Sequence, residues 1–181
     1  MRKDLRVVCM HVVLCSSCMC AILTFLASTT PPRRCDVAVT ADTTATLSTL
    51  SAPLTGLLHA GGILADAPLQ QQTAAGIRCV HAPKVAGALR LLAAAGGPAG
   101  QPLCQLVLFS SIAALTGPAG STNYAAANAS LDALAAYLRQ QGTAGASVQW
   151  GAWSGVGMVS HNTAVQVRVR GWFIYVMCPW S

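Results

Sequence analysis

The sequence contains no glutamate, and charged residues make up only 9% of its 181 positions. An independent soluble domain carries many charged side chains on its surface, so this composition indicates a part of a larger assembly or a membrane-associated chain. The 11 lysines and arginines give a net charge of +6 but are scattered along the chain. Because no basic stripe with interleaved aromatic residues forms, the sequence argues against nucleic-acid binding.

The eight cysteines do not form a recognisable metal or disulfide framework. Cys15 and Cys18 have the spacing of a metal or redox pair, but no second pair or histidine follows at the spacing of a zinc finger. The cysteines are therefore interpreted as small buried residues, and no metal site is predicted.

One long hydrophobic run is present near the N-terminus. Residues 7–27 carry no formal charge and follow Arg2, Lys3 and Arg6, which is the layout of a signal peptide or a membrane anchor. A buried hydrophobic helix and a mistaken gene start are the alternatives, and we favour the mistaken start. We therefore separate an apolar head, residues 1–33, from the rest of the chain, with membrane contact through residues 7–27 as an open alternative.

The middle of the chain alternates between short apolar runs and alanine-rich stretches. Strands are expected at 54–59, 103–109 and 146–150, and helices at 70–95 and 124–141. This alternation predicts an α/β fold with a Rossmann-like parallel sheet and helices on both faces. Residues 160–181 form an unassigned tail, with an alternating strand-like stretch at 165–170 and an apolar run at 171–177.

Polar and small residues follow the expected strands, at the edge where ligands bind in such sheets. They are His59 and Gly61 after one strand, Ser110 and Ser111 after the next, and residues 150–153 after the last. We interpret His59 as a packing or hydrogen-bonding residue at the strand end and not as a catalytic base.

Tyr124 and Asn128 lie one turn apart on a predicted helix, so both occupy one face. Ser111 ends the preceding strand, and its hydroxyl could converge with that of Tyr124 on one carbonyl oxygen. A free tyrosine has a pKa of about 10, so proton transfer near neutrality needs a nearby cation. Outside the head, the only lysine is Lys84.

This arrangement resembles the ketoreductase domains of polyketide and fatty-acid synthases, within the short-chain dehydrogenase superfamily. That superfamily usually has lysine four residues after the tyrosine, whereas synthase ketoreductases have asparagine there and bring lysine from an earlier Pro-Lys-Val segment. Here Tyr124, Asn128 and Lys84 follow the exchanged pattern, which disfavours a stand-alone short-chain dehydrogenase. Residues 34–159 carry further similar stretches, namely Leu57-Leu-His59-Ala-Gly-Gly62, Val107-Leu-Phe-Ser-Ser111, Asn123-Tyr-Ala-Ala-Ala-Asn128 and Val148-Gln-Trp-Gly-Ala-Trp153.

The resemblance implies NADPH-dependent reduction of a β-ketoacyl thioester carried by an acyl-carrier protein. Tyr124 would donate the proton, Ser111 would bind the keto oxygen, Lys84 would lower the pKa of the tyrosine and contact the nicotinamide ribose, and Asn128 would support a water chain. Further residues implied to contact the cofactor are Asp36, Ala60, Gly61 and Gly62.

The resemblance also implies a product type. In this family a Leu-Asp-Asp motif marks enzymes that make the D-configured alcohol, and this chain keeps the second aspartate in Leu64-Ala-Asp66. Thr116 stands where the opposite type has tryptophan. Asp66 and Trp153 are the expected substrate and stereocontrol residues.

The glycine-rich turn that binds the cofactor pyrophosphate is missing before residue 34. We therefore expect a domain truncated in its dinucleotide-binding half, with poor NADPH binding and little or no turnover by this chain alone. The alternative function is an inactive reductase remnant with a structural or binding role. A cytoplasmic chain working with other domains of a synthase is expected, with a membrane-anchored or secretory chain as the alternative if residues 1–30 are a genuine signal.

Overall fold

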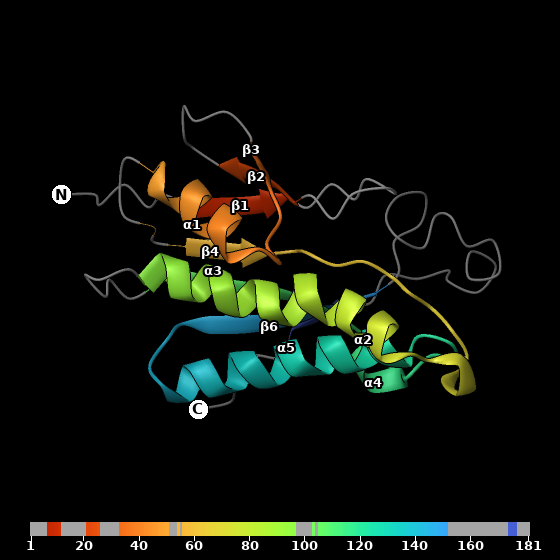
Figure 1. Cartoon of the computed structure of the whole chain (residues 1–181). Helices are drawn as coiled ribbons and strands as arrows, with labels where there is room; N and C mark the ends of the chain where they lie inside the picture. The colour runs from red at the N-terminus through yellow and green to blue at the C-terminus, as the bar shows by residue number, and fades with distance from the viewer. Residues whose placement is uncertain are drawn as a thin grey trace.

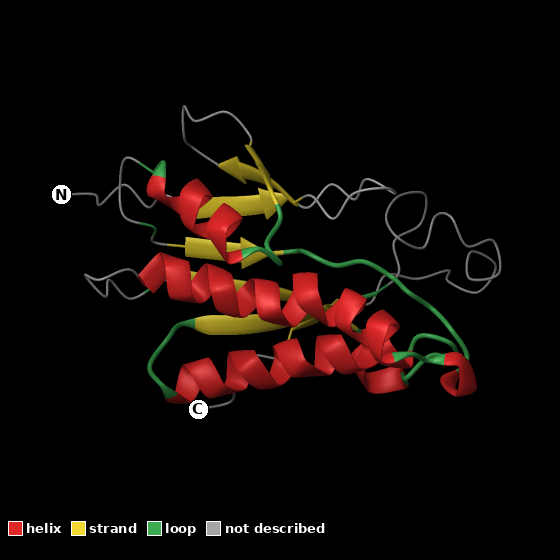
Figure 2. Ribbon diagram, viewed as in Figure 1, coloured by secondary structure: helices red, strands yellow, loops and turns green. Residues whose placement is uncertain are grey.

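The computed structural model describes residues 7–11, 21–25, 33–50, 54, 56–96, 103, 105–151 and 174–176. These residues form a seven-stranded mixed sheet with the strand order β3-β2-β1-β4-β5-β6-β7. Helices α1, α3 and α5 lie side by side in one layer against the sheet (Figures 1 and 2). The fold is therefore α/β, as the alternating pattern predicted.

The centre of the sheet consists of three parallel strands, β4 (Gly56–His59), β5 (Gln105–Ser111) and β6 (Gly145–Trp150). Burial alternates along β5 and β6, so every second side chain faces the helices. The opposite face carries half-buried residues such as Val107 and Val148. In the described part of the chain the helices cover one face only, and a second helical layer is not found there.

The described parts of the N-terminal head are strands and not a helix. β1 (Val7–His11) pairs parallel with β4, whereas β2 (Ala21–Phe25) and β3 (Arg33–Cys35) continue the sheet in antiparallel pairs. β-branched residues such as Val7, Val8 and Ile22 favour the pleated conformation. Within the ranges given above, no helix combines the length and apolar character that crossing a bilayer requires.

The helical layer contains α1 (Thr40–Ser48), α2 (Ala74–His81), α3 (Gly87–Gly96) and α5 (Thr122–Gln140). The π-helical turn η2 (Ala82–Ala86) joins α2 to α3. Two shorter elements, η1 (Leu69–Gln71) and α4 (Ala113–Thr116), precede α2 and α5 respectively. In the tail, β7 (Ile174–Val176) pairs antiparallel with β6 inside the expected apolar run, whereas residues 165–170 lie outside the described residues.

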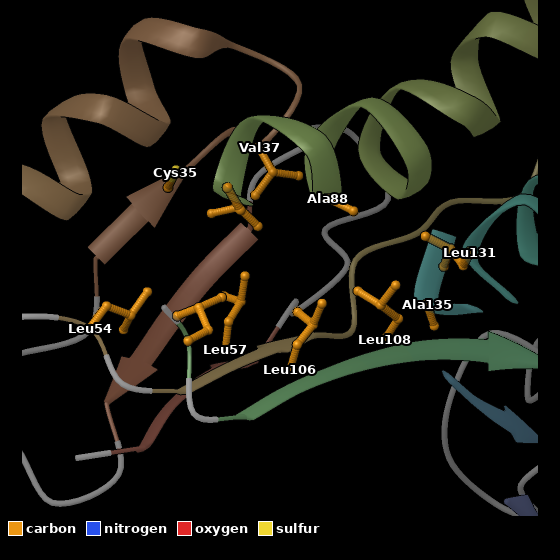
Figure 3. Packing of buried hydrophobic residues seen from close by; sticks show 11 residues of the cluster. Cys35, Val37, Leu54, Leu57, Ala88, Leu106, Leu108, Leu131 and Ala135 are labelled. Atoms are coloured by element: carbon orange, nitrogen blue, oxygen red, sulfur yellow. The ribbon is translucent and has the colours of Figure 1, made fainter. Parts of the chain in front are cut away.

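The hydrophobic core lies between the helical layer and the parallel strands (Figure 3). Leu57, Leu106 and Leu108 project from the sheet against Leu131 of α5 and Leu91 of α3, and all five are fully buried. Alanines at 88 and 135 allow the two helices to approach the sheet closely. This core fixes α3 and α5 relative to the ends of β4 and β5, where the polar residues gather.

Candidate functional site

The site forms where the carboxyl ends of β4 and β5 meet the turn η2 and the first half of α5. Lys84 comes from η2, Ser111 ends β5, and Tyr124 and Asn128 lie one turn apart in α5. The structure thus brings together four residues from three separate elements.

Lys84 is buried, with 3% of its surface exposed. Its Nζ donates to the Phe109 carbonyl at 3.1 Å and lies 5.2 Å from the centroid of the Tyr124 ring. Burial lowers the pKa of Lys84 from 10.5 to about 8, and the charge of Asp132 partly offsets this fall. At neutral pH the ammonium form therefore still predominates and can face a developing phenolate.

Burial raises the pKa of Tyr124 above its ordinary value of 10, and the Asn128 and Ser111 side chains act in the opposite direction. The lowering of this pKa by Lys84 stays a prediction. The lysine lies over the ring face, and removal of the hydroxyl from water is the largest effect on the Tyr124 pKa. Tyr124 is therefore held as the neutral phenol, which is the form that can donate a proton.

Ser111 and Asn128 complete the polar cluster. The Ser111 hydroxyl oxygen accepts from the Ala113 N–H at 3.2 Å, which orients the serine at the strand end. Asn128 is fully buried, and its Nδ2 donates to the Tyr124 carbonyl at 2.8 Å. Its Oδ1 is buried without a hydrogen-bond partner among the described residues, and a bound water could satisfy it.

The loop that follows β4 is shaped around the lysine. A Cβ added to Gly62 would lie 2.7 Å from Cε of Lys84, and one added to Gly61 would lie 2.8 Å from Cε1 of His59. Ala60 is half-buried beside them. Gly61 and Gly62 are therefore required by side chains of the protein itself, whatever ligand binds next to them.

Asp66 lies beside the start of α5, where it accepts from the Ser121 hydroxyl at 3.0 Å. Asn123, which was not selected from the sequence, ties the two segments together because its Nδ2 donates to the Ala65 carbonyl at 2.7 Å. A backbone bond from the Ala67 N–H to the Gly120 carbonyl, at 2.8 Å, adds to this link. Burial is the largest effect that raises the pKa of Tyr124, and the negative charge of Asp66 raises it further by a smaller amount.

Asp36 is not part of this cluster. It follows β3, and the sheet order places β2 and β1 between that strand and β4, a separation of about 14 Å at the usual strand spacing. Its Oδ1 accepts from the Ala38 N–H at 2.9 Å. An extended ligand would be needed to touch both Asp36 and Lys84. Trp153 lies outside the described residues.

The sequence model of the KR domain matches residues 25–155. Phthioceranic/hydroxyphthioceranic acid synthase from Mycobacterium bovis is 42% identical over 116 residues, which are 64% of this chain and 5% of that protein. Mellein synthase from Phaeosphaeria nodorum is 44% identical over 118 residues, which are 65% of this chain and 6% of that protein. The chain thus spans a small part of the length of these relatives.

Two solved structures show the same arrangement of elements. An A1-type ketoreductase superimposes with a TM-score of 0.68 and 37% identity, over 76% of this chain and 29% of that chain. The ketoreductase from the first module of phoslactomycin biosynthesis in Streptomyces sp. HK803 gives a TM-score of 0.70 and 36% identity, over 80% of this chain and 33% of that chain.

Proposed function

Because the chain belongs to the ketoreductase (KR) domain family of polyketide synthases, we propose that it carries the catalytic residues for reduction of a β-ketoacyl thioester to a β-hydroxyacyl thioester. The observation that supports this most directly is the convergence of Lys84, Ser111 and Tyr124 at the ends of β4 and β5. The reductase segment is assigned to residues 34–159, between an apolar head and an unassigned tail.

NADPH supplies the hydride when it is bound, and the chain supplies the proton and the binding of the keto oxygen. The Ser111 and Tyr124 hydroxyls donate hydrogen bonds to that oxygen, which polarises the carbonyl. Tyr124 transfers its proton to the oxygen as the carbon is reduced, so the carbonyl becomes an alcohol. The Lys84 ammonium stabilises the resulting phenolate, and Asn128 holds water through which Tyr124 regains its proton.

The residues present fit the nicotinamide end of the cofactor. The Lys84 ammonium has three N–H donors, and the bond to Phe109 uses one of them, which leaves donors for a ribose hydroxyl. Ala60, Gly61 and Gly62 form a small-residue turn beside it, and Asp36 would meet the adenine. Residues 1–33 contain no glycine-rich turn, so these residues do not supply the usual partner of the pyrophosphate.

The substrate is proposed to be attached to an acyl-carrier protein and to reach the site within a multidomain synthase in the cytoplasm. The D-configured alcohol is proposed as the product because Leu64-Ala-Asp66 keeps the second aspartate of the Leu-Asp-Asp motif. Asp66 itself lies at the start of α5, where it accepts from the Ser121 hydroxyl. Trp153 is proposed as a second residue on the substrate side. The lack of a glycine-rich turn within residues 1–33 favours one other candidate for these 181 residues alone, an inactive remnant with a structural or binding role.

The purified 181-residue chain can be tested with a soluble β-ketoacyl thioester and a large excess of NADPH. We expect slow formation of the β-hydroxyacyl thioester, detected by mass spectrometry. In the Tyr124→Phe variant the rate of this formation should fall by at least about 100-fold. Tyr137→Phe is the matched control, because Tyr137 is exposed on the far half of α5. Product from neither the native chain nor the control, with both folded, would favour the inactive remnant.

A further inference from the structure

We propose that His59 is a positioning residue, which holds the π-helical turn η2 and thereby places Lys84 beside Tyr124. The inference rests on the proposed function in one respect, namely that Lys84 serves Tyr124. Neither the family resemblance nor the motifs around Tyr124 assign this role to the histidine.

A buried hydrogen bond links the two residues. His59 is the last residue of β4 and is fully buried, and its Nε2 lies 2.9 Å from the Lys84 carbonyl oxygen. A carbonyl can only accept, so Nε2 carries the hydrogen and donates. Nδ1 is then the unprotonated nitrogen, and it is buried without a hydrogen-bond partner in the described part of the chain.

The turn needs support of this kind because it departs from the α-helix. Pro83 has no N–H and would press against the preceding turn of a regular helix, and η2 widens the helix around it. The Gly87 N–H donates to the carbonyl of Ala82, five residues earlier, and also to that of Lys84. Single π-helical turns are rare and are frequent at functional sites.

The loop after β4 is built around the same pair. A side chain at Gly61 would collide with the His59 ring, and one at Gly62 would collide with the Lys84 stem, at 2.8 and 2.7 Å respectively. The backbone therefore passes directly against both the histidine and the lysine. His59, η2 and this loop form one packed unit.

The hydrogen bond between His59 and the Lys84 carbonyl is not a charge interaction, because His59 is neutral in the pH range in which Lys84 titrates. Among the described residues, the titratable groups that face Lys84 are His59 from β4 and Tyr124 and Asp132 from α5. Burial lowers the pKa of His59 to about 4. Replacing His59 therefore changes no charge near Lys84 above neutral pH, and a shift in the lysine titration reports a change in its position.

The chain offers a direct measurement, because Lys3 and Lys84 are its only lysines. With ¹³C-labelled lysine, the pH titration of the Lys84 Cε signal can be followed with Lys3 as the internal reference. We expect His59→Leu to move the Lys84 pKa from about 8 toward 10.5, by about one unit or more as the amine becomes hydrated. His59→Gln keeps an N–H donor at the same reach and should retain the native value.

His81→Gln is the matched control, since His81 ends α2 next to the turn and is only half-buried. It should leave the Lys84 titration unchanged. A native titration in folded His59→Leu, or equal shifts in the folded Leu and Gln variants, would overturn the proposal. Circular dichroism establishes whether each variant is folded.

If His59→Leu does not fold, the proposal can be tested on the native chain. ¹⁵N spectra of labelled histidine distinguish the two neutral tautomers, and the proposal requires hydrogen on Nε2 of His59 at neutral pH. Hydrogen on Nδ1 would refute it, because Nε2 could then not donate to Lys84. None of these measurements uses NADPH or turnover, so their outcome is independent of whether the chain reduces a ketone.

Discussion

At the scale of single residues, Gly62 is tightly packed, since the Lys84 side chain fills the space that a Cβ would need. In Gly62→Ala the added carbon would lie 2.7 Å from Cε and 3.2 Å from Nζ, and the lysine is fixed by its bond to Phe109. We expect a loss of about 1–3 kcal/mol in the free energy of unfolding, measured by urea denaturation. Gly76→Ala is the control, because a Cβ there meets only the Thr73 hydroxyl at 3.4 Å and the Gln72 side chain at 3.9 Å. It should stabilise α2 by up to about 1 kcal/mol, and equal effects of the two variants would contradict the tight packing.

The charge of Lys84 leads to a prediction about pH and stability. Its pKa is about 8 in the folded chain, against 10.5 for a free lysine, so the unfolded chain binds more protons between these values. Stability should therefore rise as pH increases through this window. Lys84→Met should be more stable than the native chain by about 1–3 kcal/mol at pH 7, and this advantage should shrink toward about pH 10. A constant difference between the two denaturation curves would show that the lysine is not destabilised by burial.

At the scale of elements, the stretch from 74 to 96 shows what the sequence pattern predicted well and what it did not. The helical character expected for 70–95 is found at 74–96, after a short 3-10 turn at 69–71, but the sequence does not show which residues of this stretch are buried. Leu89 is 49% exposed, whereas Lys84 is buried. The pattern treats lysine as a surface residue, yet here tertiary contacts with His59, Phe109 and Tyr124 place it inside. The π-helical turn at Pro83 has no local signature beyond the proline.

Helix α5 is tied to β6 through Asp132, whose carboxylate accepts from the Ser147 hydroxyl at 2.6 Å and from Nε2 of Gln149 at 2.8 Å. Asp132→Asn removes an acceptor and the charge that raises the pKa of Lys84. We expect a destabilisation of about 1–3 kcal/mol together with a Lys84 pKa below its native value of about 8. Ser147→Ala is the control, since it removes one donor and keeps the charge. If it lowers the lysine pKa as much as Asp132→Asn does, the charge is not the cause.

At the scale of the whole molecule, the prediction of the sheet and of the candidate site rested mostly on the order and spacing of the expected strands and of the motif residues. Strands with small residues at their carboxyl ends, together with the exchanged lysine and asparagine, were enough to predict the parallel sheet and to select Lys84, Ser111 and Tyr124. The apolar head was harder, because a charge-free run of 21 residues, 7–27, fits a helix, a strand pair or a membrane segment equally well by composition. Its described parts are strands because β4 offers β1 a pairing edge, which is a tertiary cause that no local pattern contains.

Binding of NADPH is also a question about the whole chain. No glycine precedes Gly56 among the 181 residues, so these residues do not themselves supply a glycine-rich turn for the pyrophosphate, whereas Lys84 and the turn after β4 are proposed to hold the nicotinamide end. Since the pyrophosphate carries most of the charge that such a site neutralises, we expect the 181-residue chain to show no saturable NADPH binding at micromolar concentration by fluorescence titration. A chimaera in which the strand–turn–helix unit of an active ketoreductase replaces residues 1–33 should bind at least about 10-fold more tightly. Saturable micromolar binding by the native chain would show that the catalytic half alone suffices to hold the cofactor.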